Sequence, residues 1–346
     1  MKRPQLLALT AAALASTSML LRAGAQIAAP PAADVDLTIV NSFPVQGNVT
    51  LLIGPGGLES TSANVVVQTS DDAVVVVDSG RGDKADQYVA AIRRISRKPV
   101  RFLINTQAAL DHTGGNEAIA RSGRPFGGRA AGAGFLLPDQ NSGATIIAHE
   151  KVLNALSAAT RQPPVPQAAW PSETYFTDDL ELFNGEAIQM FHASAITDGD
   201  TIVFFRRSDV ICAGDVFSTL TYPKIDVGAG GSIAGEIAAL NQILDLAVPR
   251  DKQEGGTYIV PGHGRVADEA DVVEYRDMVY IIRDRVQDLV KKGRSLAEIK
   301  AARVSFDYDR RYSTPDWTGE RFVETVFASL TAPDRTQRKP PAATPR

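Results

Sequence analysis

The sequence contains few cysteines and aromatic residues, and these shortages limit what the protein can be. Its 346 residues include a single cysteine, which excludes an intramolecular disulfide framework and a cysteine-rich zinc module. Aromatic residues make up 7%, but the hydrophobic share of 44% is ordinary for a globular protein. Global disorder and collagen-like or low-complexity architectures are therefore excluded. The length allows two small domains or one large α/β unit.

An excess of positive charge is also absent. The chain has 36 Lys and Arg against 40 Asp and Glu, a formal net charge of −4. Without residues 1–25, which contain Lys2, Arg3 and Arg22 but no acidic residue, the charge becomes −7. Binding to nucleic acid phosphates needs a basic patch. We therefore expect no nucleic acid partner and a small-molecule substrate.

A long apolar run lies at the N-terminus. Lys2 and Arg3 precede the mostly apolar residues 6–21, and residues 23–25 read Ala-Gly-Ala, a small-x-small cleavage site. An uncleaved membrane anchor is the alternative, but the run is short for a span and contains Thr and Ser. No second arginine stands beside Arg3, so a twin-arginine signal is not indicated. We predict a signal peptide, a periplasmic or secreted protein, and no stable membrane span after its removal.

Short β-rich runs followed by helical patterns occur twice along the chain. Apolar runs between turn residues predict strands over residues 49–53, 64–68, 73–77, 100–104 and 144–148, then 180–183, 187–191, 201–205, 210–212 and 257–260. Helical spacing of apolar residues predicts helices over residues 84–95, 149–160, 233–247, 271–292, 295–303 and 319–330. Two similar halves that pack sheet against sheet, with helices outside, form a four-layer α/β/β/α sandwich, an α/β fold.

The predicted organisation has five parts. They are a signal peptide over residues 1–25, a flexible lead-in over 26–36, the main domain over 37–275, C-terminal helices packed on that domain over 276–330, and a disordered tail over 331–346. Met278, Ile282 and Val286 belong to a broad apolar face of the first C-terminal helix. The sequence leaves open whether this face packs inward or forms a homo-oligomer.

Four polar clusters each follow a predicted strand. They are Asp78, residues 111–116, residues 214–215 and residues 261–264. Strand ends converge at one edge of a sheet, where loops commonly carry function. Asp and His are ligands that zinc accepts, with iron and manganese as alternatives. Taken singly, each cluster has a simpler interpretation as a turn or helix cap, but their shared placement favours a metal site.

Four motifs in this order resemble those of the metallo-β-lactamase superfamily. Residues 105–116, NTQAALDHTGGN, are similar to the family loop N-T-H-x-H-x-D-H-x-G-G-N. Residues 197–201, 213–217 and 260–264 are similar to the family's H-T-D-G-D, A-G-D-x-[FL] and P-G-H-G motifs. The resemblance covers about residues 37–275. It implies the same sandwich fold, a metal centre where the two sheets meet, and hydrolytic chemistry.

The sequence departs from the family at one half of that centre. Gln107, Ala109 and Ile196 stand at the positions of the three histidines of the family's first metal site. Alanine and isoleucine cannot coordinate a metal, and a glutamine amide is a poor zinc ligand. The family's second site uses an Asp-His pair, the P-G-H-G histidine and, in some hydrolases, a bridging aspartate. The residues at those positions are all present: Asp111, His112, His263 and Asp215.

The resemblance therefore implies one intact half-site that holds a single Zn²⁺, with iron or manganese as alternatives. Asp111 and Asp215 are the predicted catalytic residues, Asp215 as a weaker fourth ligand or as the base that orients water. Gln107, Tyr222 and Lys224 are the predicted substrate-binding residues, with Lys224 pairing with a substrate carboxylate.

We expect an exported metal-dependent hydrolase of an ester, lactone, thioester or amide-like bond, with efficient β-lactamase activity not favoured. A non-catalytic or ligand-binding pseudoenzyme of the same fold is the alternative. Redox chemistry at an iron site is a third hypothesis, weakened because no flavin-binding domain is visible in the sequence.

Overall fold

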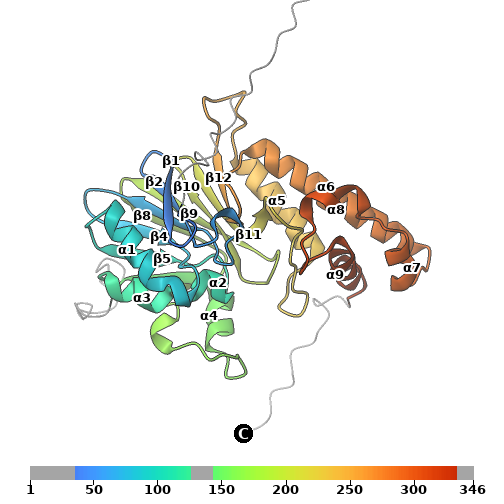
Figure 1. Cartoon of the computed structure of the whole chain (residues 1–346), viewed down its shortest axis with the longest axis horizontal. Helices are drawn as coiled ribbons and strands as arrows, with labels where there is room; N and C mark the ends of the chain where they lie inside the picture. The colour runs from blue at the N-terminus through green and yellow to red at the C-terminus, as the bar shows by residue number, and fades with distance from the viewer. Residues whose placement is uncertain (1–35, 126–142, 333–346) are drawn as a thin grey trace, which may run out of the picture.

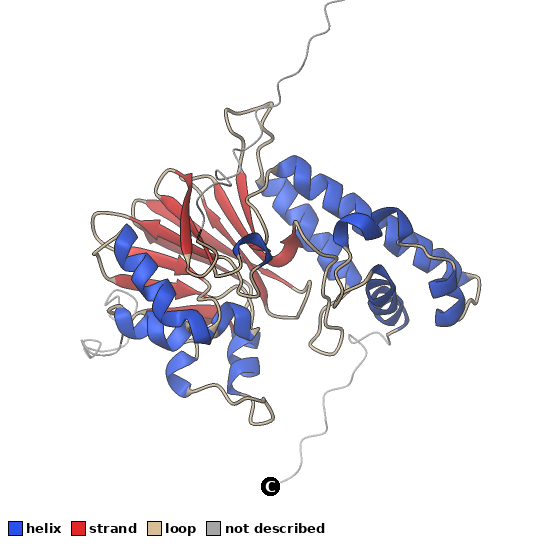
Figure 2. Cartoon of the chain, viewed as in Figure 1, coloured by secondary structure: helices blue, strands red, loops and turns tan. Residues whose placement is uncertain are grey.

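The computed structural model describes residues 36–125 and 143–332. The predicted signal peptide, the lead-in up to residue 35 and the predicted tail from residue 333 lie outside the described residues. Two β-sheets lie at the centre of the described part, and helices cover their outer faces (Figure 1, Figure 2). The predicted α/β sandwich is confirmed.

The first sheet has seven strands in chain order, an antiparallel meander followed by parallel strands. They are β1 (Asn41–Gln46), β2 (Val49–Ile53), β3 (Val65–Thr69), β4 (Val74–Val77), β5 (Val100–Ile104), β6 (Thr145–His149) and β7 (Glu173–Tyr175). Its helices are α1 (Ala85–Ile95), α2 (Leu110–Thr113), α3 (Asn116–Ser122) and α4 (Glu150–Ser157).

The second sheet has the order β12-β11-β10-β9-β8, and only its β11–β12 pair is parallel. The strands are β8 (Asp178–Phe183), β9 (Glu186–Ala193), β10 (Asp200–Phe205), β11 (Val210–Ser218) and β12 (Tyr258–His263). The helices on its side are α5 (Ile233–Leu246), α6 (Glu269–Lys291), α7 (Leu296–Ala301), α8 (Phe306–Tyr312) and α9 (Gly319–Thr331). In Figure 1, α6 to α9 extend to the right of this sheet.

The alternation of side chains in the strands separates the layers. In β4, Val75 and Val77 face the core between the two sheets, whereas Val74 and Val76 face the core under α1 and α3. Successive side chains of a strand point to opposite faces, so an all-apolar run such as β4 serves two cores at once. A third core lies between the second sheet and α5 to α9. Three apolar cores therefore hold the four layers together.

The C-terminal helices share their core with the second sheet. Helix α6 runs through residue 275, the predicted domain boundary, without interruption. Its Met278, Ile282 and Val286 are fully buried in the cluster that also contains residues of β9 to β12. The apolar face of this helix therefore packs inward. Within residues 36–125 and 143–332, no helix is long and apolar enough to cross a membrane.

Several elements differ from the sequence-based expectation. Strand β11 continues past the predicted end at Cys212 to Ser218, with register shifts on both sides of Gly214. Gly214 has a φ of +53°, a left-handed conformation that glycine adopts without a steric penalty. The strand can thus bulge and continue. The sequence does not predict the strands β1 and β7 or the helix α8. Pro44 interrupts the strand pattern of β1, and β7 has only three residues, too few for a clear alternation.

Helix α5 buries an acidic side chain in its first turn. Glu236 is fully buried, and neither of its carboxylate oxygens has a hydrogen-bond partner among the described residues. Burial raises the pKa of Glu236 well above its usual value, and the nearby charges of Asp200 and Asp215 raise it further. The folded protein therefore holds Glu236 protonated at pH values where the unfolded chain releases the proton.

We predict that Glu236 makes stability fall as the pH rises. Below about pH 4.5 both states hold the proton. Above it, only the folded state does, so rising pH favours unfolding until the folded pKa is passed. Glu236→Gln should raise the thermal unfolding midpoint more at pH 8 than at pH 5, measured by circular dichroism. Glu254→Gln, at an exposed position, is the matched control. An identical shift at both pH values would contradict the prediction.

Candidate metal centre

The candidate centre is formed by one short helix and two neighbouring strands. Asp111 and His112 lie on α2, Asp215 lies in the bulged part of β11, and His263 is the last residue of β12. Asp215 and His263 are thus parts of strands, not of the loops that follow them, which corrects the expected placement. The parallel β11–β12 pairing brings these two residues to the same edge of the second sheet.

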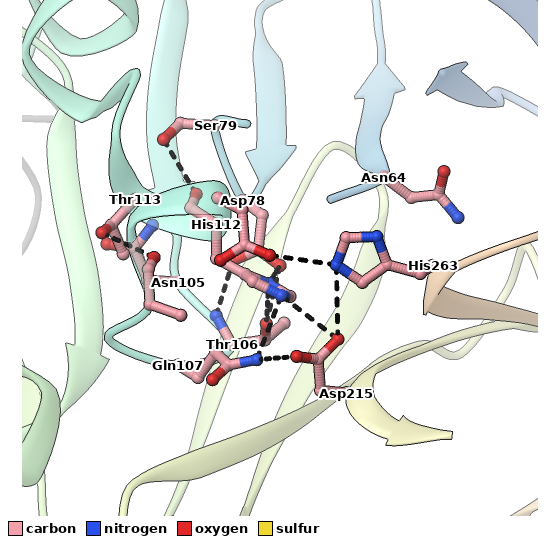
Figure 3. Close-up of polar contacts among 12 residues, drawn as sticks. Asn64, Asp78, Ser79, Asn105, Thr106, Gln107, His112, Thr113, Asp215 and His263 are labelled. Carbon is pink, nitrogen blue, oxygen red and sulfur yellow. Dashed lines mark hydrogen bonds and ion pairs between the residues drawn. The ribbon is translucent and has the colours of Figure 1, made fainter. Parts of the chain in front are cut away.

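The turn around His263 is held from the first sheet. The Asn64 side-chain amide donates hydrogen bonds to the carbonyl oxygens of Pro261 and Gly264, at 2.9 and 3.0 Å. A side chain at Gly262 would collide with the Asp215 carboxylate. The P-G-H-G turn therefore packs directly against β11, which places the His263 imidazole beside Asp215 (Figure 3).

Three of the predicted ligands converge as a metal ion requires. One ligand atom each from Asp111, His112 and His263 lies within 4.8 Å of the other two. His263 Nε2 is 3.1 Å from Asp111 Oδ2. Asp215 Oδ1 lies 3.3 Å from His112 Nε2 and 3.8 Å from His263 Nε2. Two imidazoles and a carboxylate are a donor set that suits zinc and also iron, so the residues present fit one divalent cation.

Asp78 fixes the orientation of the central imidazole. Its buried carboxylate accepts three hydrogen bonds: from His112 Nδ1 at 2.8 Å, from the Thr106 amide at 2.8 Å and from the Thr106 hydroxyl at 2.6 Å. Asp78 has a φ of +58°, an unfavourable backbone conformation for a residue other than glycine. A carboxylate behind a ligating histidine orients the ring and raises its basicity. The sequence identified the polar turn at Asp78 but not this role.

Negative charge accumulates in the centre. Burial opposes ionisation of Asp215, but His112, His263 and the Gln107 amide outweigh it and hold the pKa of Asp215 well below its usual range. Burial also opposes ionisation of Asp111, and His263 and His112 still lower its pKa. Burial disfavours a charged His112, yet Asp215 and Asp78 raise its pKa well above the usual value. These carboxylates are therefore ionised at neutral pH and favour a cation.

Gln107 reaches into the same group of ligands. Its Nε2 lies 2.6 Å from Asp215 Oδ2 and 3.0 Å from His112 Nε2, and the residue is only 3% exposed (Figure 3). The side chain of Gln107, a predicted substrate-binding residue, thus contacts two predicted metal ligands, His112 and Asp215.

Comparison with known families gives an independent result. The family model described as the metallo-beta-lactamase superfamily matches residues 56–263, more than half of the chain. The chain belongs to the metallo-β-lactamase superfamily. Comparison with curated proteins gives no significant match.

Solved structures of this superfamily fold are similar to the chain at low sequence identity. A metallo-beta-lactamase from Pontibacter korlensis has 13% identity and a TM-score of 0.50, with 70% of this chain and 99% of the other covered. The metallo-beta-lactamase DIM-1 has 16% identity and a TM-score of 0.50, with 70% and 97% covered. The sec-alkylsulfatase Pisa1 from Pseudomonas sp. has 14% identity and a TM-score of 0.57, with 84% and 50% covered. This chain thus spans half the length of that sulfatase, and these likenesses concern the fold alone.

Within this superfamily fold, two of the replaced histidine positions carry apolar side chains. Ala109 precedes α2 as its N-terminal flanking residue, and Ile196 is 4% exposed in the core of the second sheet. Neither has an atom that can bind a metal. The remaining two histidines of the chain, His149 and His192, stack on each other with ring centroids 3.8 Å apart. His192 also contacts the Asp198 carbonyl through Nε2, which accounts for it as a structural residue.

The two other predicted substrate contacts have different positions. Tyr222 is fully buried, and its hydroxyl donates to the Asp309 carboxylate of α8 at 2.9 Å. It has no surface that a substrate could contact, so the prediction for Tyr222 was wrong. The sequence could not show that α8, an unpredicted helix, covers it. Lys224 is exposed on the segment that follows β11, and its pairing with a substrate stays a prediction.

A cavity of about 230 Å³ adjoins the loop that carries Gln107. Polar and small side chains line it, among them Gln107, Ala109, Lys151, Arg161, Asp198 and Asp226. The Arg161 guanidinium donates to the carbonyl oxygen of Ala108 at 2.7 Å. The cavity therefore borders Gln107 and Ala109, two of the positions where the sequence departs from the family motif.

We predict that Asp78→Asn weakens metal binding by about 10–100-fold, because the amide no longer fixes and polarises the His112 ring. Isothermal titration of metal-stripped protein with zinc measures the change. Asp72→Asn, in an exposed turn, is the matched control and should bind like the wild type. Equal affinity in Asp78→Asn and wild-type protein would show that Asp78 does not support the ligand.

Proposed function

We propose that the chain is a metal-dependent hydrolase that uses one divalent cation, zinc in the first instance, to cleave an ester, lactone, thioester or amide-like bond. The observation that supports it is the convergence of Asp111, His112 and His263 at one edge of the sandwich. The superfamily fold adds only a general expectation of hydrolytic chemistry. One fold hosts many chemistries, so the function is argued from the site.

The chain's own residues divide the work. Asp111, His112 and His263 would hold the cation, and Asp78 keeps the His112 ring in position. A zinc ion bound there would supply a Lewis acid and lower the pKa of a water molecule. Asp215 projects its carboxylate between the two imidazoles, 21% exposed, where it can accept a hydrogen bond from water and orient it.

The cavity beside Gln107 is the proposed position of the substrate. It is small, and its charged lining groups of both signs suit a compact polar molecule. The sec-alkylsulfatase among the similar structures adds alkyl sulfates to the ester classes worth testing. We further propose that the mature protein is periplasmic or secreted, which rests on residues 1–25 alone.

The second candidate function is a non-catalytic, ligand-binding pseudoenzyme. Two contacts of one side chain favour it: the Gln107 amide lies against His112 and Asp215, so the ligand atoms have partners within the protein itself. The same pocket would then bind a small molecule without turning it over.

We predict one zinc ion per purified chain and chelator-sensitive hydrolysis in a panel of β-lactams, lactones, thioesters, aryl esters and alkyl sulfates. Asp111→Ala and His263→Ala should lower turnover about 100-fold or more, because each removes a ligand. Elemental analysis and initial rates with and without chelator measure the two effects. Asp72→Ala is the control.

Two outcomes would contradict the proposal. Two zinc ions per chain would rule out the half-site. Zinc-loaded protein without activity on any member of the panel would favour the pseudoenzyme.

A further inference from the structure

The Gln107 amide contacts one of the three converging residues and the neighbouring Asp215. Its Nε2 contacts one oxygen of Asp215 at 2.6 Å and Nε2 of His112 at 3.0 Å. His112 Nε2 is the ring atom that faces the other ligands, since Nδ1 is bonded to Asp78. The amide thus approaches the same ligand atom that the metal needs.

The partners of the amide identify it as a donor. A contact of 2.6 Å with a carboxylate oxygen requires an N–H group, because a carbonyl oxygen there would be repelled. The same nitrogen lies 3.0 Å from His112 Nε2, and Asp215 Oδ1 lies 3.3 Å from that ring atom. His112 Nε2 is therefore engaged by neighbouring side chains inside the protein.

These contacts have consequences for stability and for binding. Gln107 and His112 are buried, so without the amide the polar atoms around it would lose a partner that water cannot easily replace. A cation needs the lone pair of His112 Nε2 and therefore competes with these contacts. Gln107 also lines the 230 Å³ cavity, which leaves space on its other side.

We propose that Gln107 is an internal competitor of the metal. Its carboxamide closes the centre in metal-stripped protein and turns toward the cavity when a cation binds to Asp111, His112 and His263. This inference rests on the metal site of the proposed function. It makes Gln107 a residue that sets metal affinity.

The test compares Gln107→Ala and Gln107→Leu with the wild type. Leucine nearly preserves the volume but has no donor, so it separates hydrogen bonding from packing. Zinc affinity is measured by competition with a chromogenic chelator, and the thermal midpoint of unfolding is measured in EDTA. We expect both variants to bind zinc about tenfold more tightly or better, the equivalent of one lost hydrogen bond, and to unfold at lower temperature in EDTA. Gln167→Ala, at an exposed position, is the control.

Three other outcomes would each overturn a stated claim. Unchanged or weaker zinc binding in both variants, with a wild type that binds zinc, overturns the competition and leaves the proposed function standing. An unchanged midpoint in EDTA overturns the claim that the amide closes the centre. Absence of zinc binding by all three proteins overturns both this inference and the metal-dependent function.

Discussion

The hydrogen bond between Asp78 and His112 connects the segments that form the centre. Asp78 directly follows β4, and its carboxylate also accepts two hydrogen bonds from Thr106, which lies two residues after the end of β5. The left-handed backbone of Asp78 is unfavourable for an aspartate in isolation, but three hydrogen bonds compensate for it. The strained backbone at Asp78 thus directs its carboxylate toward His112. Because the ring has one fixed partner on Nδ1, its other nitrogen must point toward Asp215 and His263.

Charge in the candidate centre favours a bound cation. Asp78, Asp111 and Asp215 surround two imidazoles in a largely buried space. A neutral amide satisfies hydrogen bonds but leaves the net negative charge of the carboxylates in place. A cation compensates that charge directly, and the low local dielectric strengthens the attraction. The Gln107 amide and a metal ion would therefore satisfy the same side chains with unequal charge.

The fold and the convergence of Asp111, His112 and His263 were predictable because both rest on local patterns. Val74–Val77 indicates a strand buried on both faces, and the Asp111-His112 pair and His263 belong to short motifs with little freedom in spacing. What escaped prediction depends on contacts between distant residues. The bulge that extends β11 needs the register with β12, and Asp215, a partner of Gln107, lies 108 positions away along the chain. No periodicity reports such contacts.

The burial of Tyr222 gives the C-terminal helices a role in the site. This residue follows β11 by four positions, and its ring stacks on Phe322 of α9 with centroids 5.1 Å apart. The Tyr275 hydroxyl of α6 donates to the Thr221 carbonyl at 3.0 Å. The segment after β11 is therefore held from behind by helices outside the matched family region. Because Asp215 lies on β11 itself, these helices restrain the strand that carries it. They act on the centre through packing, since none of the three converging residues belongs to them.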